Sequence, residues 1–260
     1  MSQLFLDILQ LPERCLIQKR LTKAFFLKHF SLTAAEKKLL NEGIEQMDWL
    51  ASIRAAHVPA YVSDTHSYEE VQVFAVELRT SSASGRVDRS GAKVADLVQK
   101  YVPYPVLLIV FDHENYLVNV CTKRINQNDA SKRTVEASVS TPVLSLLYAD
   151  ELATSFHQAL RFARLDKTDL RTLYDSYLQA VVQCRAAAQT GVFRERPHVR
   201  SAEDLATLQR MDALEAEIKA LRAKATKDLP LREQVALNMD IQERREEIEA
   251  LRRSLASAAE

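Results

Sequence analysis

The segment Glu69–Thr80 constrains the fold more than any other part of the chain, because its residues alternate between two faces. Val71 and Val73 share one face with Glu77 and Arg79. A period of two with β-branched residues is typical of a β-strand. The charged pair at one end of an otherwise apolar face indicates either a salt bridge at the sheet edge or a functional site.

The segments around this strand predict an α+β fold, with a mixed-sheet α/β core of roughly four to six strands in residues 1–148. Thr33 and Glu36 match a capping box, and apolar residues recur every three or four positions from Leu39 to Ile53, which predicts a helix. The expected helices cover residues 15–29, 33–53 and 92–101, and the expected strands cover residues 57–62, 71–79, 106–111, 116–121 and 133–139.

The second half of the chain is predicted to be helical, with a helical middle at residues 149–200 and a coiled-coil hairpin at 201–260. In the hairpin, apolar residues step by three and four, with Glu, Lys and Arg on the flanks. Asp228 and Pro230 predict a break between two antiparallel helices. The seam either closes within the chain or docks a partner subunit or a second copy. Its expected residues are Met211, Leu214, Ile218, Leu221, Leu237, Ile241, Ile248 and Leu251.

The charge balance argues against nucleic-acid binding by bulk positive charge. Lys and Arg total 35, as do Asp and Glu, so the formal net charge is zero. Cations concentrate only locally, in the loop Thr122–Arg133, where Lys123, Arg124, Lys132 and Arg133 surround short amides that could contact phosphates. The alternative interpretation of this loop is a solvated hairpin extension.

Glycine and cysteine usage exclude several other classes of protein. Four glycines form no phosphate-binding loop, so a nucleotide-driven motor or a dinucleotide oxidoreductase is not expected. Three cysteines show no metal-ligand spacing and are expected to be reduced thiols in a cytoplasmic protein. The first residues lack the order of a signal peptide, and no apolar run is long enough for a membrane span. We therefore expect no metal, no cofactor and no membrane attachment.

The order of several sequence blocks resembles the bacterial domain-of-unknown-function family numbered 4391. The blocks are a helix before Trp49, VQVFAVELR, YVPYPVLLIVF, TKRINQNDASKRTVE, LYDSYLQAVVQCRAAAQTGVFR and a heptad tail. The resemblance covers nearly all of the chain. It implies a small accessory protein of the kind encoded beside helicases and DNA methyltransferases of restriction or phage-defence clusters, and it brings no established site residues.

Glu77-Leu78-Arg79 also resembles the E-x-K element of restriction-endonuclease-like folds, with Arg in place of Lys. In such nucleases two carboxylates hold Mg²⁺, and Asp64 or Glu70 would be the second carboxylate. Arg stabilises negative charge but is a poor proton acceptor, which argues against cleavage. The leading hypothesis is therefore a non-catalytic adaptor of a DNA-processing defence system. Its partner would be a helicase, a methyltransferase or a second copy, with DNA as a possible ligand. A Mg²⁺-dependent nuclease, active or degenerate, is the alternative.

Overall fold

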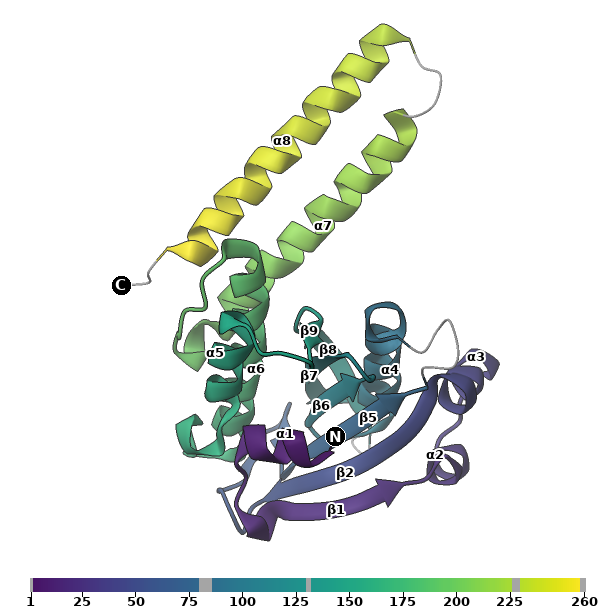
Figure 1. Ribbon diagram of the computed structural model, residues 1–260, viewed down its shortest axis with the longest axis vertical. Helices are drawn as coiled ribbons and strands as arrows, with labels where there is room; N and C mark the ends of the chain where they lie inside the picture. The colour runs from purple at the N-terminus through teal and green to yellow at the C-terminus, as the bar shows by residue number, and fades with distance from the viewer. Residues whose placement is uncertain (1, 80–85, 130–131, 226–229, 258–260) are drawn as a thin grey trace.

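The computed structural model describes residues 2–79, 86–129, 132–225 and 230–257, and its centre is a mixed seven-stranded sheet (Figure 1). The strands of this sheet are β1 (Leu16–Leu21), β2 (Ile44–Arg54), β5 (Glu70–Leu78), β6 (Val106–Phe111), β7 (Asn115–Ile125), β8 (Arg133–Ser140) and β9 (Leu144–Ser145). Their order is β1-β2-β5-β6-β7-β8, and β9 pairs with β7. A separate pair consists of β3 (Tyr61–Val62) and β4 (Ser67–Tyr68).

Helices cover both faces of the sheet. The described helices are α1 (Ser2–Leu9), α2 (Lys23–His29), α3 (Ala34–Lys38), α4 (Val87–Tyr101), α5 (Glu151–Leu160), α6 (Leu170–Thr190), α7 (Ser201–Ala225) and α8 (Leu231–Ala256). Only β5 and β6 are parallel among the pairs of the large sheet, because α4 carries the chain back between them. The sheet therefore mixes both pairing modes, as expected for an α/β core.

The predicted strand at residues 71–79 is confirmed as β5, and its two faces enter different cores. Val71, Val73 and Ala75 pack in the core that includes α1, α5 and α6. Phe74 and Val76 pack in the core that includes α4. Since β5 lies inside the sheet, between β2 and β6, both faces are buried, as expected for a strand covered on both sides.

The predicted helix at residues 33–53 is wrong beyond residue 43. The capping box of Thr33 and Glu36 does begin α3, but Ile44–Arg54 is strand β2. The strand carries two β-bulges, one at Glu45 and one at Leu50, where one residue of β5 faces two of β2. Each bulge adds one residue to the period of two, so buried positions recur at spacings of three. The bulges thus reproduce the apolar spacing of a helix.

The predicted helix at residues 15–29 is also wrong in its first half. Leu16–Leu21 is β1, which pairs with β2 and has an irregularity between Leu16 and Lys19. Gln18 has φ 50°, a left-handed conformation at this irregularity. The helix α2 begins only after Thr22, whose side chain accepts a hydrogen bond from the Phe25 amide. The sheet therefore has more strands than predicted, because β1 and β2 come from segments expected to be helical.

The C-terminal helices α7 and α8 lie side by side and antiparallel, and they project away from the sheet (Figure 1). Before them, α6 ends at Gly191, whose φ of 79° is the left-handed conformation that glycine adopts without strain. The predicted seam residues Met211, Leu214, Ile218, Ile241 and Ile248 are buried. Leu221, Leu237 and Leu251 are half-buried. One contiguous core joins these helices to α6 and to the sheet.

Candidate functional sites

The predicted nuclease carboxylates do not converge on one point. Glu70 and Glu77 lie seven residues apart on β5, which is about 23 Å at the rise of an extended strand. Their positions also alternate to opposite faces of the sheet. Asp64 lies in the exposed turn between β3 and β4, where the carbonyl of Thr65 accepts a hydrogen bond from the Ile125 amide. Glu70 and Glu77 are therefore too far apart to hold one metal ion together.

The predicted partner of Glu77, Arg79, forms an ion pair with Glu45. Arg79 Nε donates to Glu45 Oε2 at 2.8 Å, and both side chains are partly exposed. Glu45 is the bulged residue of β2, so the bulge directs its carboxylate toward Arg79. Of the two interpretations of the charged end of β5, a salt bridge therefore accounts for Arg79.

The sheet places another carboxylate, that of Asp48, beside Glu77, although the sequence pattern did not indicate it. Asp48 pairs with Ala75, so Glu77 is its diagonal neighbour on the same face. Gln46 Nε2 donates to both Asp48 oxygens at 2.7 and 2.8 Å, and Ser2 Oγ donates at 2.6 Å from α1. Asp48 was missed because its segment was predicted to be a helix, in which this proximity does not arise.

Glu70 lies at a cavity of about 360 Å³ that aromatic side chains surround, here called the aromatic pocket. It forms where β1, β2, β5, α2 and the connection after α4 meet. Phe25 and Tyr104, both 43% exposed, contribute aromatic surface from different elements. The complete lining is Leu21, Phe25, Phe26, Phe30, Trp49, Arg54, Glu70, Gln72, Phe74, Val102, Pro103 and Tyr104.

A chain of hydrogen bonds forms the polar side of the aromatic pocket. Trp49 Nε1 donates to Gln72 Oε1 at 2.8 Å, and Gln72 Nε2 donates to Glu70 Oε2 at 2.7 Å. Ser52 Oγ donates to the same Glu70 oxygen at 3.2 Å. Arg54 Nε donates to Ser52 Oγ at 3.0 Å and lies 3.6 Å from Glu70 Oε2. The network holds Glu70 in place and leaves a guanidinium at the partly exposed edge of the pocket.

The four cations predicted for phosphate contacts do not form one exposed cluster. Lys123 is buried, and its ammonium donates to the carbonyls of Val102 at 2.7 Å and Tyr104 at 2.9 Å. Burial lowers the pKa of this ammonium to about 8. In this fold Lys123 therefore binds the chain just after α4 and does not face a ligand.

The other three cations lie near the β7–β8 connection. Lys132 forms an ion pair with Asp129 at 3.0 Å, and Arg124 lies 3.9 Å from Glu136. Arg133 donates to the carbonyl of Lys132 at 3.2 Å. Residues 130–131 of the predicted loop lie outside the described residues. Partial neutralisation by acidic neighbours makes this loop a weaker phosphate site than the sequence pattern predicts.

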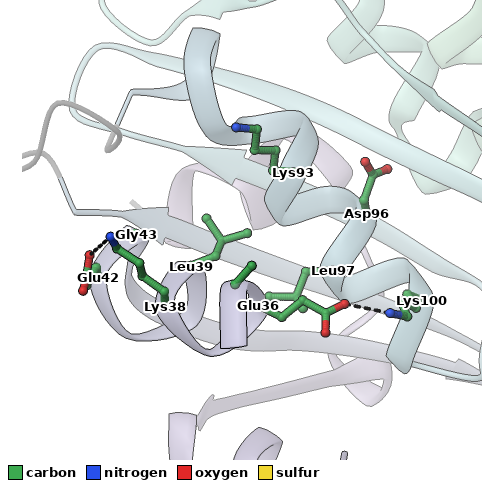
Figure 2. A pocket seen from close by; sticks show the side chains of 10 residues that line it. Glu36, Lys38, Leu39, Glu42, Gly43, Lys93, Asp96, Leu97 and Lys100 are labelled. Atoms are coloured by element: carbon green, nitrogen blue, oxygen red, sulfur yellow. Dashed lines mark hydrogen bonds and ion pairs between the residues drawn. The ribbon is translucent and has the colours of Figure 1, made fainter. Parts of the chain in front are cut away.

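A second cavity, of about 470 Å³, lies between α3 and α4 and contains paired charges (Figure 2). Lys100 Nζ donates to Glu36 Oε1 at 2.7 Å, and Tyr101 OH donates to Glu36 Oε2 at 2.9 Å. Lys100, and then the amide of Thr33, lower the pKa of Glu36 to about 2. Glu36 therefore joins the start of α3 to the last turn of α4.

Replacing Glu36 by Gln should lower the melting temperature at neutral pH by about 2–4 °C, which corresponds to a loss of about 1 kcal/mol of unfolding free energy. The depressed pKa stabilises the fold above the unfolded value near 4.5, and this contribution is lost as pH falls toward 2. The difference between wild type and Glu36→Gln should therefore shrink across that window, measured by circular dichroism. Glu42→Gln is the control, since Glu42 lies 3.9 Å from Lys38 and both are well exposed. If the difference in melting temperature between the two proteins does not change with pH, the ionised Glu36 carboxylate does not stabilise the fold.

A buried ion pair anchors the α7–α8 hairpin to the rest of the molecule. Arg196 Nη1 donates to Asp204 Oδ1 at 2.8 Å, and both side chains are almost fully buried. Arg196 Nη2 also donates to the carbonyls of Leu255 at 2.6 Å and Ser257 at 2.7 Å, at the end of α8. Gln183 Nε2 on α6 donates to the carbonyl of Arg196 at 3.0 Å. One guanidinium thus joins α7 and α8, and its backbone is held by α6.

The part of the chain that the structure describes offers little metal or thiol chemistry. There, no three His, Cys, Asp or Glu side chains group in a way that could hold a metal ion. Cys15, Cys121 and Cys184 are buried free thiols, and burial raises the pKa of each. No helix among these residues is both long and apolar enough to cross a bilayer.

These features define a mixed α/β protein with a seven-stranded sheet, an aromatic pocket and a projecting pair of helices. The chain belongs to the family described as Domain of unknown function (DUF4391), whose model matches residues 9–248. The match includes the sheet, the aromatic pocket and most of the α7–α8 hairpin. Comparison with curated proteins and with solved structures found no match.

Proposed function

We propose that this protein is a non-catalytic accessory subunit of a bacterial DNA-processing defence system, and that it acts in the cytoplasm. In this proposal the α7–α8 hairpin is a coiled coil that docks a helicase or methyltransferase partner. The observation that supports it most is the projection of this hairpin away from the sheet, with its own seam already closed (Figure 1). The family membership agrees with a small accessory protein but names no activity.

The contacts along the hairpin favour a preformed arm over an unpaired helix. Arg210 Nε donates to Glu247 Oε1 at 2.7 Å, and Arg244 Nε donates to Glu217 Oε2 at 2.7 Å. Such charged pairs flanking an apolar seam set the register of antiparallel helices. Because the seam is buried within the chain, a partner must bind the outer surface of the arm.

The distal part of the arm offers an apolar contact for such a partner. Val235 and Met239 lie four residues apart on α8, so they share one helix face. They are 50% and 63% exposed, although most of the surrounding surface residues of α8 are polar. A small exposed apolar pair at the end of a rigid arm fits a contact with another protein.

Replacing Val235 and Met239 together by Glu should reduce partner capture at least about tenfold and leave the fold intact, because both side chains are exposed. Tagged full-length protein would be tested for capture of candidate helicase and methyltransferase subunits, and the molar mass of the complexes would be measured by light scattering. The matched control is Ala236→Glu with Ala216→Glu, which adds the same charge at other exposed positions of the hairpin. Unchanged capture by the Val235/Met239 variant would contradict docking through this face. A dimer that this variant abolishes would point to a second copy as the partner.

A second candidate function is a metal-dependent nuclease with a restriction-endonuclease-like core. The succession of antiparallel β2 and β5, then α4, then parallel β6 is compatible with such a core. The proximity of Asp48 to Glu77 favours this candidate, since Mg²⁺ is commonly held by one or two carboxylates together with substrate phosphates. Cleavage of plasmid, linear or single-stranded DNA in Mg²⁺ or Mn²⁺ that Glu77→Gln and Asp48→Asn each abolish would replace the adaptor proposal with this one.

A further inference from the structure

A basic segment free of acidic residues borders the aromatic pocket. Between Arg14 and Ala35 the chain has five Lys or Arg residues and no Asp or Glu, although the whole chain has zero net charge. This segment forms β1 and α2, so the fold gathers its cations at one edge of the sheet. The same segment supplies three of the pocket's aromatic side chains, Phe25, Phe26 and Phe30.

A further cavity, of about 350 Å³ and distinct from the one between α3 and α4, adjoins the aromatic pocket and is here called the basic hollow. The two share Leu21 and Phe26 in their linings, so they lie on either side of these residues. The basic hollow contains the cations Arg20, Lys23 and Arg79 and one acid, Glu45. Arg79 is paired with Glu45, and Lys23 Nζ donates to the carbonyls of Asn41 at 3.0 Å and of Ile44. The formal charge of the hollow remains positive, which is complementary to a phosphate.

We propose that the aromatic pocket and the basic hollow together bind single-stranded nucleic acid, with a base in the pocket and the adjoining phosphates at the hollow. Phe25 and Tyr104 supply partly exposed aromatic rings on which a base can stack. Glu70 supplies an acceptor and Arg54 a donor for the edge of that base, while the buried Gln72 holds Glu70 in place.

The geometry favours a single strand over a duplex and over a peptide. Bases in a duplex are stacked inside the helix, so only an unpaired base can enter a pocket of this kind. An acidic peptide would also suit the cations, but its acidic side chains would bring no planar ring to stack on the aromatic side chains of the pocket. The inference uses residues on β1, α2, β2 and β5, so it is independent of partner docking through the α7–α8 hairpin.

The single tryptophan of the chain gives a direct test. Trp49 lines the pocket, so a base stacking there should quench its fluorescence. We expect labelled oligothymidylate and oligouridylate to bind at low salt by fluorescence polarisation, with parallel quenching of Trp49. About two phosphate contacts, from Arg20 and Lys23, predict a log–log salt slope near −1.4, from roughly 0.7 per contact on a single strand.

Variants of the exposed lining should weaken binding without unfolding the protein. Phe25→Ala and Tyr104→Ala should each weaken it about tenfold. Arg54→Gln should weaken binding and leave the salt slope unchanged, whereas Arg20→Gln in the basic hollow should reduce the slope by about 0.7. Tyr148→Ala and Arg245→Gln are the matched controls, since both residues are exposed and lie outside either cavity; Tyr148 is 71% exposed.

Several results would overturn the proposal. One is equal affinity for a duplex of the same sequence. Another is binding that Phe25→Ala and Tyr104→Ala leave unchanged but that Lys132→Ala with Arg133→Ala abolishes, since this would place the site at the β7–β8 connection. A third is the absence of oligonucleotide binding together with tight binding of an aromatic-containing peptide that quenches Trp49.

Discussion

Leu214→Asp is expected to open the α7–α8 hairpin and to cost at least about 4 kcal/mol of unfolding free energy. Leu214 is fully buried in the hydrophobic core that joins α6, α7 and α8. A carboxylate at this position must either stay buried without a partner or force the helices apart. The second outcome exposes the apolar faces of both α7 and α8.

The measurement is thermal unfolding followed by helical circular dichroism, combined with limited proteolysis. The variant should lose helical signal at low temperature and become sensitive to cleavage within α7 and α8. Ala216→Asp is the matched control, because it adds the same charge to an exposed position two residues away. It should cost about 1 kcal/mol or less. Equal stability of the two variants would mean that the seam does not hold the hairpin closed.

Asp204→Ala is expected to destabilise the protein by about 3 kcal/mol or more, or roughly 6–12 °C in melting temperature. The reason is that Arg196 stays buried without its carboxylate partner. Its hydrogen bonds to the carbonyls of Leu255 and Ser257 remain, but carbonyls do not neutralise the charge. The loss should appear at the end of α8, where those carbonyls lie.

Asp212→Ala is the control for this experiment, since Asp212 forms a more exposed ion pair with Arg185 at 2.5 Å. Removal of that pair should cost less than about 1 kcal/mol. The double change Arg196→Met with Asp204→Leu removes both charges and should recover part of the loss, because a buried pair of apolar residues carries no desolvation penalty. If Asp204→Ala and Asp212→Ala prove equally mild, the buried pair is not the anchor of the hairpin.

Several elements follow from local sequence because one physical signal dominates each of them. The alternating Val71–Ala75 segment and the apolar Val106–Phe111 run are β-strands, as their patterns predict. The helix α6 ends at Gly191 as predicted, since glycine adopts the left-handed cap without strain. The seam of the hairpin also follows from its spacing of three and four residues, since a helix places such positions on one face.

Other elements could not be predicted from the local sequence pattern, because pairing with neighbouring strands changes the spacing of their buried residues. In β2, which has bulges at Glu45 and Leu50, the buried residues Ile44, Met47, Leu50 and Ile53 follow one another at intervals of three. This spacing is the same as that of a helix, and only pairing with β5 on one side and β1 on the other decides for a strand. Because this segment was predicted to be a helix, the position of Asp48 beside Glu77 could not be predicted.

The candidate sites also combine features that the sequence determined with features that only the tertiary structure decided. The sequence determined by itself that the chain has an α/β core, a pair of C-terminal helices and a formal net charge of zero, because these properties depend on composition and on spacing along the chain. Only the tertiary structure placed Asp48 beside Glu77, buried Lys123 under the end of α4, and joined Phe25, Arg54 and Tyr104 around one cavity. Such groupings arise from strand pairing and helix packing between distant segments, and these contacts leave no periodic signal in the sequence.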